Sequence, residues 1–177
     1  MQRLVFFILI SNYTYCQSIN QDSVVFYFEE ILNFERYSMG LKPLTRNKDL
    51  GDFTNYWSVS MAKNNRLSHG TGETSFNERI RNSKFKHSVF TAENVASIPI
   101  INLDIRSLGY EYSALITRYN KGGYTTKDFA LLIFQIWKKS PPHYETLLSP
   151  NTEFFWLSIS QSKSSFYFSF LCLRINL

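Results

Sequence analysis

The chain is poor in the residues that define several classes of small protein. Its 177 residues include only 2 Cys, 7 Gly and 5 Pro, which excludes a disulfide-built scaffold, a collagen-like repeat and a low-complexity chain. The apolar run at 4–10 is far shorter than the roughly 20 residues that a membrane-spanning helix needs. The zinc-protease HExxH, the GxSxG elbow, the P-loop and the dinucleotide fingerprint are all missing from the sequence.

Concentrated charge is also missing. The formal net charge is +5, from 19 Lys and Arg against 14 Asp and Glu. The basic residues are scattered, and the densest patch, 79–87 (RIRNSKFKH), is short. We interpret this patch as a solvated face and expect no nucleic-acid partner, since one short patch is weak evidence for phosphate binding.

The first 16 residues have the pattern of a signal peptide. Arg3 supplies a positive charge before the apolar run, and Thr14 and Cys16 are small residues at positions −3 and −1 of a cut before Gln17. A lipid anchor on Cys16 is the alternative, although the bulky Tyr15 disfavours it. We therefore expect residues 17–177 to form one secreted, periplasmic or cell-envelope domain with a net charge of +4 (18 − 14).

What the chain does contain is material for a core. Hydrophobic residues make up 44% and aromatic residues 17%, which indicates a folded domain with many buried rings. Apolar spacing predicts helices over 22–39 and 48–64, a short one opened by Ser75 with Glu78 in a capping box, and one from Thr125 to the prolines at 141 and 142. Two aromatic, β-branched stretches, 153–160 and 166–175, predict an antiparallel pair at the end. This order of elements predicts an α+β domain with helices packed on a sheet.

Three polar side chains are the candidates for chemistry. His69, Glu93 and His143 are expected in loops that follow amphipathic helices, where a rigid base would let them converge. Two imidazoles and a carboxylate suit a zinc-like divalent cation, or proton transfer at a histidine whose tautomer the carboxylate fixes. Two serines, 68 and 140, are interpreted as turn and cap residues because no oxyanion loop accompanies them. Cys172, the one cysteine after the signal, is predicted to be buried and unreactive, with no internal disulfide.

Five short motifs in order resemble the CAP superfamily, also called SCP domains, in its disulfide-free bacterial branch. The motifs are ILNFERYSMGLKPLTRNKDL, SMAKNNRLSHG, SFNERI, AENVA and WKKSPPHYETLL, and the resemblance runs from about residue 31 to 173. It implies a three-layer α-β-α sandwich with a central antiparallel sheet and a cleft lined in many members by two His and two Glu.

Carried over residue by residue, the resemblance gives three of these four places to His69, Glu93 and His143. The second glutamate is replaced by Ser140, and the glycine that usually precedes the second histidine is Pro142. The segment 98–123 looks like an insertion, which either walls the cleft or decorates the surface.

The function implied is a secreted module whose cleft binds a divalent metal such as zinc, a lipid or sterol, or a protein partner, without turnover. His69 and His143 are the expected metal ligands, and Ser140 and Glu93 line the cleft beside them. A metal-dependent hydrolase or protease with Glu93 as general base is the alternative, which the missing second glutamate disfavours. An envelope protein with a vestigial cleft is a third reading. We expect a monomer that does not span the membrane and is not a conventional enzyme.

Overall fold

The computed structural model describes residues 20–100, 103–104 and 108–175. The predicted signal peptide, 1–16, lies outside these residues. The helices are α1 (Gln21–Ser38), α2 (Gly51–Asn64), α3 (Phe76–Arg81), α4 (Ser113–Asn120), α5 (Thr126–Lys138) and α6 (Pro141–Leu147). The strands are β1 (Thr45–Arg46), β2 (Phe90–Pro99), β3 (Phe154–Gln161) and β4 (Ser165–Arg174), with short 3₁₀ turns at 48–50, 72–74 and 110–112.

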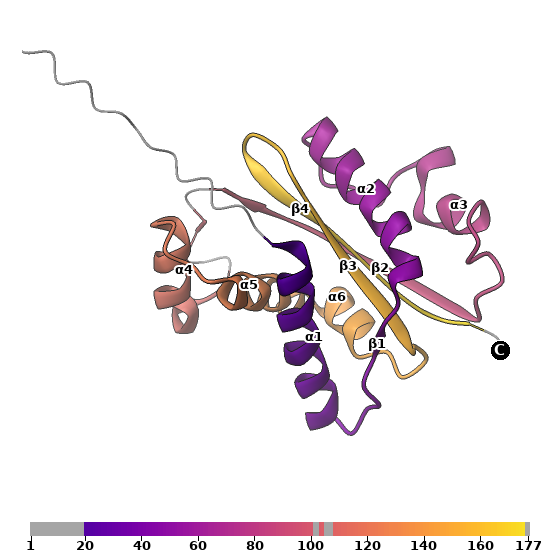
Figure 1. Cartoon of the computed structure of the whole chain (residues 1–177), viewed down its shortest axis with the longest axis horizontal. Coiled ribbons are helices and arrows are strands. Elements are labelled where there is room, and N and C mark those ends of the chain that lie inside the picture. The colour runs from indigo at the N-terminus through magenta and orange to yellow at the C-terminus, as the bar shows by residue number, and fades with distance from the viewer. Residues whose placement is uncertain (1–19, 101–102, 105–107, 176–177) are drawn as a thin grey trace, which may run out of the picture.

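The strands form one mixed sheet in the order β1-β3-β4-β2. The three long strands pair antiparallel, and β1 joins β3 in parallel through two residues. Figure 1 shows these strands running side by side through the molecule with helices around them. The predicted α+β sandwich is therefore confirmed, with β1 making the sheet mixed rather than purely antiparallel.

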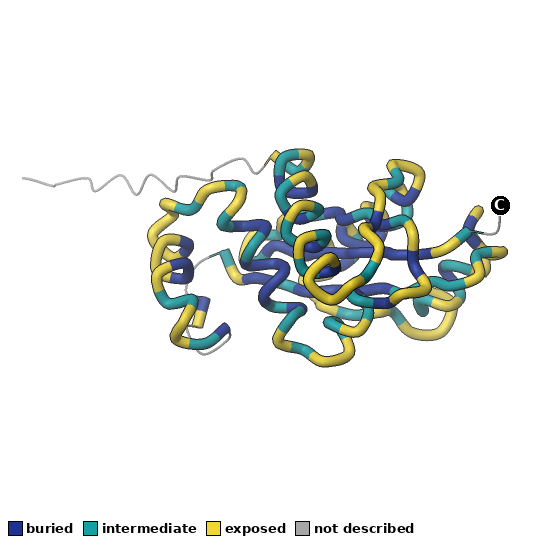
Figure 2. Tube along the Cα trace, turned by 90° about the horizontal axis from the view of Figure 1, so that it is seen from below, coloured by how far each residue is buried: buried dark blue, intermediate teal, exposed yellow. Residues whose placement is uncertain are grey.

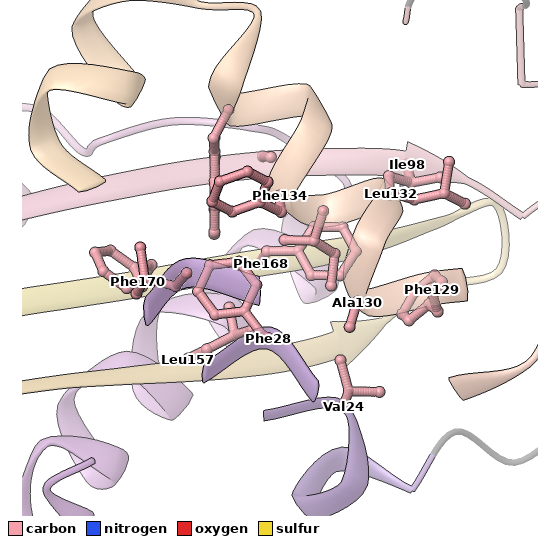
Figure 3. Packing of buried hydrophobic residues seen from close by; sticks show 14 of the residues in the cluster. Val24, Phe28, Ile98, Phe129, Ala130, Leu132, Phe134, Leu157, Phe168 and Phe170 are labelled. Carbon is pink, nitrogen blue, oxygen red and sulfur yellow. The ribbon is translucent and has the colours of Figure 1, made fainter. Parts of the chain in front are cut away.

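The larger core lies between one face of the sheet and α1, α4, α5 and α6. Phe28 of α1 packs against Phe134 and Trp137 of α5 and against Phe170 of β4, with ring centroids 5.7–6.2 Å apart. Such ring pairs each contribute about 0.5–1.5 kcal/mol beyond the area they bury. Figure 3 labels Phe28, Phe134 and Phe170 within this core, and Figure 2 shows the buried residues gathered in the middle of the molecule.

The segment 98–123 contributes to this core. Leu108, Leu115 and Ile116 are buried in the main cluster, and Ile98 is the last buried residue of β2. These described side chains thus pack into the domain rather than only covering its surface, while the origin of the segment as an insertion stays a prediction.

The smaller core lies on the opposite face of the sheet, under α2 and α3. Odd-numbered residues of β4 such as Leu171 and Leu173 point there, because side chains alternate along a strand. Trp57 and Met61 of α2, with Leu50 at its N-cap, provide an apolar stripe that faces the sheet, as the spacing predicted. This face also carries polar contacts, since the side-chain hydroxyls of Thr54 and Ser58 form hydrogen bonds with those of Ser158 and Ser160, respectively.

Three local expectations are wrong. Pro141 and Pro142 do not only stop α5, which already ends at Lys138; they are the first residues of α6, so His143 lies on a helix rather than in a loop. Proline suits a first helical turn because the N–H that it lacks has no intrahelical partner there.

Glu93 also lies outside a loop, in the middle of β2. The caps of two helices differ as well. Asn20, outside the predicted range 22–39, caps α1 by accepting a hydrogen bond from the Ser23 amide. Ser75 caps α3 as expected, but the Glu78 carboxylate pairs with Arg81 instead of completing a capping box.

Candidate functional site

The three candidate residues come together at β2, from three different elements. Glu93 points from β2 to the α2/α3 face, His69 stands on the loop after α2, and His143 stands in the first turn of α6. The ring centroids of His69 and His143 are 6.4 Å apart, with an angle of 34° between the ring planes. His69 Nδ1 lies 3.0 Å from Glu93 Oε2.

The loop of His69 is fixed by backbone geometry and by Trp57. The Trp57 indole N–H donates to the Ser68 carbonyl at 2.8 Å, and the Ser68 hydroxyl accepts from the Gly70 amide. Gly70 has φ +82°, and a Cβ there would lie 1.9 Å from the Thr74 carbonyl oxygen. Only glycine fits this turn, which carries His69 next to Glu93 with half of the His69 side chain exposed.

His143 is placed by the neighbouring strand residue. The Asn94 amide donates to the His143 carbonyl at 2.8 Å, from the face of β2 opposite to Glu93. Burial, and after it the charge of His69, lowers the pKa of His143. The neutral imidazole, which is the form that binds metals, is therefore favoured at His143.

Arg79 of α3 is the partner of Glu93 that the sequence did not reveal. Its Nη2 donates to both Glu93 carboxylate oxygens at 2.9 Å and to the His69 carbonyl at 3.3 Å. Its Nε donates to the Thr74 carbonyl. The guanidinium carbon lies 3.9 Å from the centroid of the Trp57 ring, which is a cation–π contact. The buried Nη1 has no hydrogen-bond partner among the described residues.

This ion pair decides what Glu93 can do. Its side chain is 1% exposed and that of Arg79 is 7% exposed. Because a carboxylate only accepts hydrogen bonds, the His69 contact requires a proton on Nδ1, which leaves Nε2 of His69 as the free nitrogen. Glu93 therefore orients His69, and its two oxygens are already occupied.

The other residues considered in the sequence lie outside the contacts among His69, Glu93 and Arg79. Ser140 is the N-cap residue of α6, one turn before His143, and its side chain makes no cap hydrogen bond. His87 is exposed in the segment before β2. Cys172 is buried in β4, where burial raises the pKa of its thiol to about 12, and it is a free cysteine. Sequence reasoning missed Arg79 because a basic residue in a short polar helix normally indicates a solvent-exposed position.

A three-ligand metal site is not formed. Across 20–100, 103–104 and 108–175, no group of three or more His, Cys, Asp or Glu is arranged to hold a metal ion. Two imidazoles that share a tetrahedral zinc ion have ring centroids roughly 5 Å apart, given Zn–N bonds of about 2.0–2.1 Å. The 6.4 Å separation of the His69 and His143 rings is wider than this, so a shared ion requires the two rings to approach each other by roughly 1 Å, whereas Arg79 holds Glu93 in place.

Comparisons with solved structures identify relatives of the fold. An outer surface protein from Borrelia burgdorferi superposes with a TM-score of 0.59 at 16% identity, over 85% of this chain and 90% of that one. An extracellular SCP-domain protein from Bacillus anthracis gives a TM-score of 0.55 at 16% identity, over 88% of this chain. A cysteine-rich secretory protein from Staphylococcus aureus gives 0.54 at 18%, over 89%. This chain spans only 41% and 40% of the latter two proteins.

Sequence comparison gives the family. No curated protein matches the chain in sequence. A family model, however, matches residues 30–173, which include α2, the His69 loop, β2 and α6. The match covers most of the chain and agrees with the sandwich fold, and it shows that this protein belongs to CAP, the cysteine-rich secretory protein family.

Proposed function

We propose that this protein is an extracellular CAP-domain module that binds a divalent cation, zinc being the best-suited ion, through His69 and His143 without turnover. The observation that carries the proposal is the pairing of Arg79 with both oxygens of Glu93. It leaves the two imidazoles as the available donors of the site. The extracellular location is supported by the signal-like first 16 residues and by relatives described as outer-surface, extracellular and secretory proteins. No helix in the described part of the chain is long and apolar enough to cross a bilayer.

Glu93 and the two histidines have different roles in the proposed binding. Glu93 accepts a hydrogen bond from the Nδ1–H of His69 and so leaves Nε2 available to a metal ion, which is how a carboxylate commonly orients a metal-binding imidazole. The lowered pKa of His143, caused by burial and then by His69, keeps its ring neutral. A zinc ion bound here would supply Lewis acidity and open positions for water or a ligand's oxygen. With two protein ligands, binding is expected to be weaker than at a structural four-ligand site.

The hydrolase alternative asks Glu93 to take a proton from water. A general base must reach the water within about 2.6–3.2 Å, and Glu93 is 1% exposed with both oxygens bound to Arg79. This arrangement favours binding over catalysis. Hydrolysis of a broad peptide and ester panel that is faster in the wild type than in Glu93→Gln would favour the enzyme instead. A lipid, sterol or protein ligand stays a prediction from the family resemblance.

Isothermal titration with ZnCl₂ tests the proposal. We expect one equivalent bound by the wild type and by His87→Ala, which removes an exposed histidine elsewhere. We expect at least about a tenfold loss of affinity in His69→Ala and in His143→Ala, because each removes one of two ligands. Unchanged zinc binding in both single variants, with folding verified by circular dichroism, would overturn the proposal.

A further inference from the structure

An open pocket on the α2/α3 face is lined by neither of the two histidines. It has a volume of about 420 Å³ and lies between the start of α2 and the segment that follows α3. Volumes of about 300–1,000 Å³ are typical of small-molecule sites. Arg79 lines this pocket while its Nη2 holds Glu93, so one side chain belongs to both places.

The walls of the pocket are aromatic. Phe53, Tyr56 and Phe85 line it, and the rings of Phe53 and Phe85 meet edge to face at 6.2 Å. Phe85 is buried, which makes it a fixed wall, whereas Tyr56 is 62% exposed at the mouth. A solvent-exposed aromatic ring beside a hollow offers its negative π face to a ligand.

The rim of the pocket is acidic. Asp49, Asp52 and Glu73 line it together with one lysine, Lys84. The positive charge of Arg79 is already balanced by the buried Glu93 carboxylate. The uncompensated rim charge is thus −2, three carboxylates against one ammonium, and the Lys84 Nζ is 3.8 Å from Asp49 Oδ1. Arg79 and Lys84 already lie over the rings of Phe53 and Phe85, which leaves the exposed Tyr56 ring. An exposed aromatic ring beside excess carboxylates is the chemistry that recognises an organic cation.

We infer that this pocket binds a small organic ammonium ion with an apolar or aromatic body. The body lies against Phe53 and Phe85, and the ammonium group lies at the rim near Asp52 and the Tyr56 ring. An anionic ligand is disfavoured because the three rim carboxylates would repel it. This inference concerns a site apart from the histidine pair and does not depend on zinc binding.

The test is a pair of probes with the same shape and different charge. 2-Phenylethylammonium and the neutral 2-phenylethanol are titrated into the purified 15N-labelled protein, and amide shifts around Tyr56 give the affinities. We expect the cation to bind at least about threefold more tightly than the alcohol, with shifts confined to the pocket. Equal affinities of both probes, or an absence of binding to the pocket, would overturn the inference.

Two charge-removing variants with opposite expected effects sharpen the test. Asp52→Asn, at an exposed position, should weaken binding of the cation about three- to tenfold, and Lys84→Gln should strengthen it, because Lys84 competes for the same rim. Neither should alter binding of the alcohol. The two variants changing cation affinity in the same direction, or not at all, would show that the pocket recognises only the apolar body and would contradict the inference. His143→Ala serves as the control, since loss of zinc binding there should leave this titration unchanged.

Discussion

Two buried arginines support the two histidines through different partners. Arg36 supports the helix that carries His143, and Arg79 supports the loop that carries His69. Arg36 of α1 is 1% exposed and donates to the carbonyls of Leu147 and Ser149, at the end of α6, and to that of Lys42. Arg79 instead meets a buried carboxylate and three aromatic rings. Arg36 thus donates hydrogen bonds to carbonyls at the end of α6 that have no partner within the helix. Arg79 connects the loop that carries His69 to the strand that carries Glu93.

The difference lies in how each charge is compensated. The carbonyls at the end of α6 carry partial negative charge, so Arg36 needs no carboxylate, although burial lowers its pKa. Arg79 is one member of an ion pair, in which each charge is costly to bury without the other. Mutation of Arg36 should therefore cost only the hydrogen bonds that it donates at the end of α6. Mutation of Arg79 should in addition leave a buried carboxylate without its cation, and should lower the free energy of unfolding by more.

The largest expected effect comes from breaking the coupled pair. Arg79→Met leaves the Glu93 carboxylate buried without its cation, and we expect the free energy of unfolding to fall by about 3–5 kcal/mol. Urea denaturation followed by circular dichroism measures it. The double variant Arg79→Met/Glu93→Leu should recover most of the loss. A loss below about 1 kcal/mol in Arg79→Met would mean that the pair behaves like an exposed one.

A smaller effect is expected at the other arginine. Arg36→Met removes the donors from the Leu147 and Ser149 carbonyls but leaves no buried charge behind. We expect a loss of about 2–3 kcal/mol in the same denaturation experiment. Zinc affinity should also fall, since α6 carries His143. A loss larger than that of Arg79→Met would reverse the comparison.

The smallest effect is expected at a polar contact between α1 and α6 that depends on pH. Burial raises the pKa of Glu35, but hydrogen bonds from Lys138 and Tyr144 outweigh it and lower the pKa below the usual 4.5. The stabilisation by this carboxylate is fully present above pH 4.5 and is lost as pH falls through the lowered value. Tyr144→Phe should cost about 1 kcal/mol at about pH 7 and less at about pH 3. A cost that grows on acidification would contradict this assignment.

The sequence predicted secondary structure well where the apolar residues follow a single pattern, either helical or extended. The helix α5 begins at the predicted cap, where Thr125 and Asp128 form the reciprocal capping box, and Trp137 is fully buried. The strands β3 and β4 were equally clear, because both stretches are rich in aromatic residues. The family resemblance then supplied the sandwich fold.

The sequence misplaced Glu93 and His143, which were predicted in loops and lie in a strand and a helix. In β2 the polar Glu93 and Asn94 interrupt the apolar alternation, yet both are buried. Arg79 pairs with the Glu93 carboxylate and the Asn94 side-chain amide donates to the His143 carbonyl, while the Asn94 Oδ1 has no hydrogen-bond partner among the described residues. The prolines that end one helix are also able to begin the next, so position alone did not place His143. Arg79 was missed because its burial depends on Trp57 and Glu93, which lie far away in sequence.

The most direct measurement of the central claim is a long-range 1H–15N spectrum of the histidine ring nitrogens, recorded with and without one equivalent of Zn²⁺. If Glu93 orients His69 and is itself held by Arg79, the metal-free protein shows His69 with its proton on Nδ1, and zinc shifts ring nitrogens of both His69 and His143. A metal-free His69 with its proton on Nε2, or a zinc-induced change that leaves His143 unaffected, would contradict the account.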